Sequence, residues 1–388
     1  MKIKILVYIL ILGLGLLVGG LITRNYVLPK LSGEKVTPIN IIFPKKEVIG
    51  FLPYWLFSKA DQDYSKYITT LTYFSLTVDK DGTIQKYTKP GESEPGYLGL
   101  QNGKADPFLS SAKDKGLDLS LAVFNGNDGD INEILKDPAT SANNLTGEVI
   151  PIMRQYGFTD LNLDIEQTQD ASPAARINFV QFVQDVKNNL DNAKAGMLSI
   201  DVSAISFVKD SNLADPAALA PIVDKVILMA YDYHSTASFV TGPVAPAYGA
   251  GSVSELDTDS AIAAALKIMP TEKLILGIPL YGYEWETIGN TARSAVIPGA
   301  SLIISNQRAE DFLAGCATCS ATFDTTDEES HIIYETGTGT YQQIFYPNEN
   351  STQIKVNMAK EYSLGGIAVW ALGYEGKTIL EPLSLYHN

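Results

Sequence analysis

Residues 159–166 read TDLNLDIE and alternate polar and apolar side chains with a period of two. This period is typical of a β-strand, in which residues two positions apart share a face. One face of the predicted strand is apolar. The other face carries Asp160, Asn162, Asp164 and Glu166. Because burying unpaired charge is costly, the stretch is either a strand with a solvated polar face or part of a catalytic site, and the remaining sequence must decide between these explanations.

The composition fits a globular protein with a large core. The chain has 388 residues, of which 45% are hydrophobic and 19% are charged. A barrel of strands and helices fits this length as one domain. The formal net charge is −15, and such a surface repels phosphate backbones, so we expect no nucleic-acid partner.

The N-terminus carries a predicted membrane signal. An uncharged run over residues 5–23 lies between Lys4 and Arg24 and has about the length that spans a bilayer. We predict that residues 1–24 form an uncleaved signal anchor, with the remaining chain outside the cytoplasm. Secretion after signal-peptide cleavage is the alternative, although no Ala-x-Ala site follows and the run is long for a signal peptide. Residues 25–47 contain scattered turn formers and are predicted to be a linker.

The chain has two cysteines, Cys316 and Cys319. Two thiols and three histidines argue against a zinc site with four protein ligands. In an exported domain, a disulfide across this short loop is the predicted state, and two free thiols are the alternative.

Strands and helices alternate along residues 48–388. The clearest helix is predicted to begin at Ser172, as the cap, and Pro173, and to carry one apolar face. A second helix is predicted over residues 142–156, with a kink or restart at Pro151. Residues 284–350 are predicted to be an inserted α+β subdomain. The eight predicted strands are residues 47–53, 70–78, 117–124, 159–166, 197–202, 225–230, 273–279 and 365–372.

Eight such units predict a closed (β/α)8 TIM barrel, an α/β fold whose chemistry lies at the carboxyl ends of its strands. An open doubly wound sheet is the alternative, but no glycine-rich phosphate loop follows the first strand, which argues against dinucleotide binding. Polar or aromatic residues stand at several predicted strand ends: Tyr54, Trp55, Asn125, Asp164, Glu166, Tyr231, Asp232, Tyr281 and Trp370.

These strand ends resemble glycoside hydrolase family 18, the chitinase-like barrels. The fourth strand of that family carries Asp-Gly-x-Asp-x-Asp-x-Glu, and Asp164 and Glu166 match its last two acids. Asn162 and Thr159 stand where the family has aspartate, and Asp160 replaces the glycine. The form Asn-x-Asp-x-Glu resembles the spore-germination and cortex-lytic branch of the family, which acts on peptidoglycan.

The resemblance extends to two further strands. Met229, Tyr231 and Asp232 match the Met-x-Tyr-Asp of the sixth strand, and Trp370 matches a tryptophan on the eighth. The Ser-x-Gly-Gly of the third strand is poorly kept, because residues 122–126 read AVFNG. An α+β insertion between the last two strands is also common in the family.

The resemblance implies hydrolysis of β-1,4 bonds in polymers that contain N-acetylglucosamine, either peptidoglycan or chitin. In that family the substrate's own N-acetyl group is the nucleophile. Glu166 would protonate the leaving oxygen, Asp164 would orient the acetamide, and Tyr231 would donate a hydrogen bond to it. The alternative is a sugar-binding protein that has lost catalysis.

The other matched residues are expected to bind substrate, and no metal or cofactor is expected. Asn162 is predicted to donate a hydrogen bond to Asp164 in place of a protonated aspartate. Tyr54, Trp55 and Trp285 either extend the groove, form a lid or belong to the core. The residues predicted to bind substrate are Asn162, Asp232, Met229, Trp370 and Tyr281.

Overall fold

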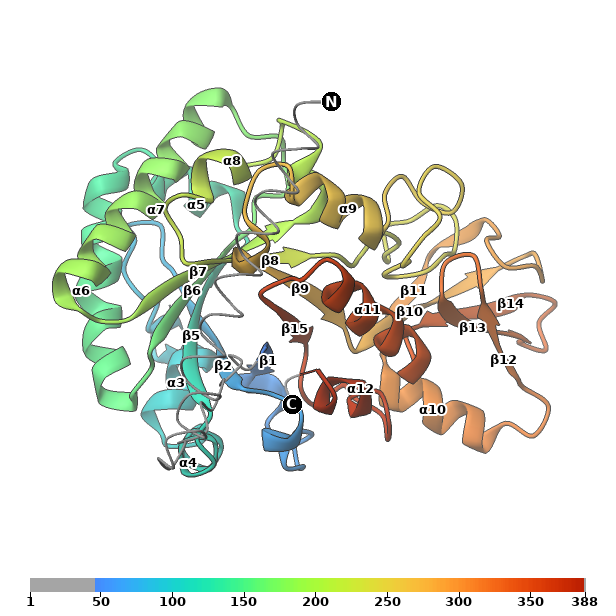
Figure 1. The fold of residues 1–388 in the computed structure, drawn as a ribbon. Helices are drawn as coiled ribbons and strands as arrows, with labels where there is room; N and C mark the ends of the chain where they lie inside the picture. Colours follow the sequence, from blue (N-terminus) through green and yellow to red (C-terminus); the bar gives the residue numbers. More distant parts are fainter. Residues whose placement is uncertain (1–45, 387–388) are drawn as a thin grey trace, which may run out of the picture. The chain divides into compact units, whose positions relative to one another are not determined.

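The computed structural model describes residues 46–386, in which eight parallel strands close into a barrel (Figure 1). Around the barrel the strands follow the order β1-β15-β9-β8-β7-β6-β5-β2, so each barrel strand lies beside the barrel strands that precede and follow it in the chain. The predicted TIM barrel is confirmed. The barrel strands are β1 (Glu47–Pro53), β2 (Thr70–Thr77), β5 (Asp118–Asn125), β6 (Asp160–Ile165), β7 (Met197–Ser203), β8 (Lys225–Met229), β9 (Leu274–Pro279) and β15 (Gly366–Trp370).

Helices connect the strands and cover the outside of the barrel (Figure 1). The predicted start of α7 is confirmed, because the Ser172 hydroxyl accepts the Ala175 N–H and Pro173 is the first helical residue. Helix α6 begins four residues before its predicted start and runs through Pro151 without a restart. Since Pro151 is exposed, water can reach the carbonyl that its ring leaves without a partner. The helices are α3 (Pro95–Gln101), α4 (Asp106–Asp114), α5 (Asp128–Ile134), α6 (Pro138–Tyr156), α7 (Pro173–Ala193), α8 (Pro216–Leu219), α9 (Thr258–Ala265), α11 (Glu349–Glu361) and α12 (Glu381–Ser384).

Strand β6 is buried along its whole length. Leu161 and Leu163 belong to the large core cluster to which the apolar face of α7 also contributes. Asp160, Asn162 and Asp164 are 4%, 1% and 5% exposed on the opposite face. The solvated-strand explanation is therefore wrong, because a closed barrel covered by helices buries both faces of each strand.

An antiparallel five-stranded sheet stands in the chain between β9 and β15. It begins at Tyr281, three residues before the predicted insertion. Trp285 is fully buried in its core and donates through Nε1 to the Ser235 carbonyl, so Trp285 does not extend a groove. This part comprises β10 (Tyr281–Thr287), β11 (Val296–Ser305), α10 (Asn306–Gly315), β12 (Ala321–Asp324), β13 (Glu329–Glu335) and β14 (Tyr341–Tyr346); a separate hairpin, β3 (Tyr87–Lys89) and β4 (Glu92–Ser93), follows β2.

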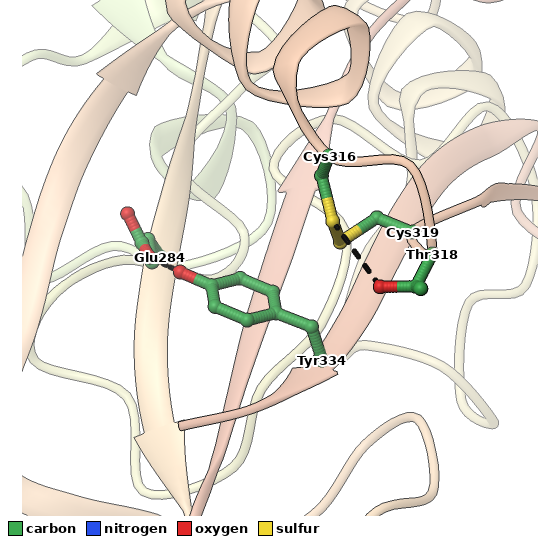
Figure 2. The surroundings of a disulfide bond; sticks show 5 residues. All are labelled: Glu284, Cys316, Thr318, Cys319 and Tyr334. Carbon is green, nitrogen blue, oxygen red and sulfur yellow. Dashed lines mark hydrogen bonds between the residues drawn. A yellow bond between two sulfur atoms is a disulfide. The ribbon is translucent and has the colours of Figure 1, made fainter. Parts of the chain in front are cut away.

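Cys316 and Cys319 form a disulfide in the loop after α10, with their Cα atoms 5.3 Å apart (Figure 2). The predicted pairing is confirmed. Nearby, the Tyr334 hydroxyl on β13 donates to Glu284 Oε1 on β10 over 2.8 Å. These contacts stabilise the loop and the sheet beside it, away from the polar face of β6.

The predicted anchor, residues 1–24, and nearly all of the predicted linker lie outside the described residues. The barrel begins at Glu47, one residue before its predicted start. Within residues 46–386, no helix combines the length and the apolar character needed to cross a membrane.

Candidate active site

A cavity of about 370 Å³ opens at the carboxyl ends of the barrel strands. Its lining comes from residues in the last part of the barrel strands or just after them, where the barrel fold places an active site. It brings together all the predicted site residues except Asn162, which lies one level deeper. The lining residues are Phe51, Tyr54, Trp55, Phe74, Ser75, Thr77, Phe124, Asp164, Glu166, Asp201, Met229, Tyr231, Asp232, Tyr281 and Trp370.

The two acids of the β6 motif occupy different depths of the cavity. Asp164 is buried, and its Oδ1 atom has no hydrogen-bond partner within residues 46–386. Glu166 directly follows the strand and is an exposed residue at the mouth, but its carboxyl group lines the cavity and is desolvated there. The Glu166 N–H donates to the Asn125 carbonyl of β5 over 2.9 Å, which fixes the backbone that carries this acid.

The pKa values of Asp164 and Glu166 are both raised, so each acid keeps its proton to a higher pH than it would in water. Desolvation raises the pKa of Asp164 well above its usual range, and the charges of Glu166 and Asp201 add to the shift. Desolvation also raises the pKa of Glu166, followed by the charge of Asp232. Since none of the ion pairs formed within residues 46–386 includes these four carboxyl groups, no lysine or arginine offsets their repulsion.

Tyr231 and Asp232 enter the cavity just after β8. Asp232 has a left-handed backbone, with φ of 62°, which aspartate tolerates better than most residues. The hydroxyls of Tyr281 and Tyr283 both donate to Asp232 Oδ1, the latter over 2.7 Å. Desolvation still raises the pKa of Asp232, against the effect of these two donors.

Tyr231 is a permanent hydrogen-bond donor in this environment. Desolvation raises the pKa of Tyr231 well above its usual range, and the charges of Asp201, Asp164, Glu166 and Asp232 raise it further. Its hydroxyl therefore keeps its proton at any physiological pH. It can donate to a carbonyl oxygen placed between it and the β6 acids.

Trp370 provides an aromatic surface across the cavity from the acids. It is the last residue of β15, and β15 lies four strands away from β6 in either direction around the barrel. Its ring centroid is 4.6 Å from that of Phe74, 5.9 Å from Phe51 and 6.3 Å from Trp55. Trp55 is 46% exposed, so this cluster presents an apolar face to the cavity.

The predicted hydrogen bond from Asn162 to Asp164 is not formed. Asn162 Nδ2 instead donates to Asp201 Oδ1 over 2.8 Å and to Ser199 Oγ over 3.2 Å. Both acceptors lie on β7. Ser199 is the register partner of Asn162, about 4.8 Å away on the next strand, and Asp201 lies two residues further along β7.

Asp201 is a cavity residue that the sequence reasoning missed. It is 8% exposed. The available signal was the period-two pattern of residues 197–203, MLSIDVS, which puts Asp201 on the same face as Ser199. Conversely, Asn125 is a structural residue, because its side chain donates to the Val78 carbonyl and accepts the Asn127 N–H.

A barrel with unpaired carboxyl groups and an aromatic surface in the cavity at the ends of its strands belongs to the class of (β/α)8 enzymes that act on sugars. The sequence profile of the family "Glycosyl hydrolases family 18" matches residues 47–375. The chain belongs to this family, and the resemblance seen in the motifs is confirmed.

Individual relatives agree with this assignment. The cortical fragment-lytic enzyme of Bacillus subtilis (strain 168) is 25% identical over 318 residues, which cover 81% of this chain and 67% of that protein. The probable chitinase 2 of Drosophila melanogaster is 26% identical over 276 residues, which cover 66% of this chain and 56% of that protein.

Solved structures share the fold. The spore cortex-lytic enzyme SleL of Bacillus megaterium QM B1551 has a TM-score of 0.71 and 19% identity, covering 91% of this chain and 76% of that chain. The GH18 chitinase of Cycas revoluta, solved in complex with (GlcNAc)3, has a TM-score of 0.73 and 22% identity, covering 88% of this chain and all of that chain.

Proposed function

We propose that this protein hydrolyses β-1,4 glycosidic bonds in polymers that contain N-acetylglucosamine, with retention of configuration. The observation that carries the proposal is the arrangement on β6: a buried Asp164 lies below Glu166, and none of the residues from 46 to 386 that line their cavity is a lysine or arginine. The pKa of Glu166 is raised, which suits proton donation near neutral pH.

The reaction uses the substrate's acetamide as nucleophile. Glu166 protonates the glycosidic oxygen while the acetamide oxygen attacks the anomeric carbon and the bond to the leaving sugar breaks. Asp164 accepts the acetamide N–H and stabilises the positive charge that develops on this group. Tyr231 donates to the acetamide oxygen and fixes the geometry of attack. Glu166, now a carboxylate, then takes a proton from the water that opens the cyclic intermediate.

The remaining cavity residues hold the sugar. Trp370 offers a flat apolar face to the sugar ring. Asp232, oriented by Tyr281 and Tyr283, accepts from sugar hydroxyls or the acetamide. A sugar-binding protein without catalysis would not need an acid with a raised pKa at the position of Glu166, so this residue favours the enzyme.

The polymer is peptidoglycan or chitin, and one experiment separates them. Relatives named for each substrate are similar to this chain, a cortical fragment-lytic enzyme and a probable chitinase. Purified peptidoglycan and chitin should be digested side by side by the parent and by Glu166→Gln, with mass analysis of the products. New reducing ends from one polymer, absent with the variant, identify the substrate; none from either polymer refutes the proposal.

We propose further that residues 1–24 anchor the protein in a membrane with the barrel outside the cytoplasm. The support is the uncharged run between Lys4 and Arg24 together with the Cys316–Cys319 disulfide, a bond typical of oxidising compartments. Fractionation of cells and protease treatment of intact cells test this. A soluble protein in the medium that lacks residues 1–24 would support signal cleavage instead.

A further inference from the structure

Asp201 lies beside Asp164 on the neighbouring strand. The register of β6 and β7 pairs Asn162 with Ser199 and Leu163 with Ile200, so the next residues along the two strands are Asp164 and Asp201. Paired residues of parallel strands point to the same face of the sheet. Both carboxyl groups accordingly line the same cavity.

The hydrogen bonds of the two carboxyl groups are complementary. Asp201 accepts the Asn162 amide through Oδ1. Asp164 has an Oδ1 atom that no group within residues 46–386 contacts by a hydrogen bond. A proton on Asp201 Oδ2 would supply the donor that this buried oxygen lacks, and an unsatisfied buried acceptor is costly.

The charges around Asp201 favour the retention of such a proton. On β6, Asp160 lies deeper, Asp164 lies beside it and Glu166 lies nearer the mouth; from the β8 side, Tyr231 and Asp232 face the cavity. Among residues 46–386, no lysine or arginine lines the cavity. Desolvation raises the pKa of Asp201 well above its usual range despite the Asn162 donor, and the charges of Glu166 and Asp160 add to it. Two such neighbours titrate jointly and share one proton.

We propose that Asp201 is a positioning residue that donates a shared proton to Asp164. The sequence of bonds runs from the Asn162 amide to Asp201 Oδ1, and from the Asp201 Oδ2–H to Asp164 Oδ1. Asp164 thereby remains an anionic acceptor, held in the orientation that receives the acetamide N–H. The carboxyl group that the family motif has at position 162 is thus supplied from β7. This role rests on the proposed function.

Two substitutions separate a donor from a structural side chain. Asp201→Asn keeps the shape, still accepts from Asn162 and offers Asp164 a permanent N–H donor. We expect kcat within about fivefold of the parent, with one ionisation fewer in the pH–rate profile. Asp201→Ala removes the donor, and we expect kcat to fall by roughly 10²-fold with KM little changed, because Asp164 loses its orientation. Asp118→Asn and Asp118→Ala, at the exposed first residue of β5, are the matched controls.

A second readout does not depend on turnover. Infrared difference spectra of the parent minus Asp201→Asn at neutral pH should contain a protonated-carboxyl band that is absent from the Asp118 difference spectrum. Absence of that band overturns the proposal. This test remains valid even if the protein cleaves neither polymer and the proposed function is wrong. If Asp201→Asn is as impaired as Asp201→Ala while both fold, the carboxylate and not the donor is required, and the proposal is wrong. If Asp201→Ala does not fold, the pH–rate profile and the infrared spectrum of Asp201→Asn test the proposal.

Discussion

Glu166→Gln tests the acid at the mouth of the cavity. The substitution keeps the size of the side chain and removes only its transferable proton. Protonation by a positioned general acid contributes about 10²–10⁴-fold to the rate, or roughly 3–5 kcal/mol of transition-state stabilisation. We expect a loss in the upper part of this range, about 10³–10⁴-fold, because the other acids that line the cavity within residues 46–386 are less suited to replace the donor. Asp164 lies deeper, and Asp232 Oδ1 is already occupied by two tyrosine hydroxyls.

The assay compares two substrates with different leaving groups. The first is an unmodified N-acetylglucosamine oligosaccharide, whose leaving hydroxyl needs a proton. The second is an aryl glycoside, whose phenolate leaves with little protonation, so Glu166→Gln should lose at least about tenfold less with it. Binding of the oligosaccharide should be unchanged, since the cavity keeps its lining.

The pH dependence gives an independent check. Desolvation and Asp232 raise the pKa of Glu166, so the parent holds the acid form to a higher pH than a free glutamate and loses activity as the pH rises above that pKa. The pH–rate profile of Glu166→Gln should lack this loss of activity at high pH. Glu133→Gln, on an exposed part of α5, is the matched control. A fall in kcat below tenfold, or equal losses on both substrates, would refute the role of Glu166.

Three further outcomes are expected. Trp370→Ala should weaken oligosaccharide binding by roughly 10–100-fold in titration calorimetry, the effect of losing about 100 Å² of apolar contact, while circular dichroism shows a folded barrel. Cys316→Ser with Cys319→Ser should cost at most about 2 kcal/mol in urea unfolding, because the closed loop is short, and should leave activity intact. The free energy of unfolding of the parent should decrease as the pH rises, and this decrease should be smaller in Asp160→Asn.

The sign of the Asp160 effect follows from its environment. Desolvation raises the pKa of Asp160 in the fold, against Lys225 and the hydroxyls of Ser120 and Ser199. The native state then binds more protons than the unfolded chain above about pH 4, so stability falls as the pH rises through the raised pKa. Asp81 has a lowered pKa owing to its bonds with Thr83, so Asp81→Asn should lose stability at neutral pH instead.

Each of these outcomes has a result that contradicts it. A Trp370→Ala variant that does not fold would make Trp370 a core residue. Full alkylation of both cysteines without prior reduction would exclude the disulfide. Parallel pH–stability curves for the parent and Asp160→Asn would show that Asp160 titrates alike in the folded and unfolded chains.

The sequence by itself determined the barrel and most of its cavity. Local signals were sufficient, because strand and helix periods, the Ser172 cap and turn residues depend on neighbours along the chain. The rule that parallel barrels present their carboxyl strand ends at one face then placed Asp164, Glu166 and Trp370 together.

Only the tertiary structure decided which partners the polar side chains have. Asn162 bonds to β7 and not to Asp164, and Asp201 joins the cavity, because barrel closure sets a register between strands that neither segment encodes alone. Burial likewise separated Trp285, which lies in the core of the second sheet, from Trp55, which is exposed at the cavity. The sequence pattern around a tryptophan near a strand end does not distinguish a core position from a cavity position. The packing of distant elements against the side chain determines whether a sugar can reach it.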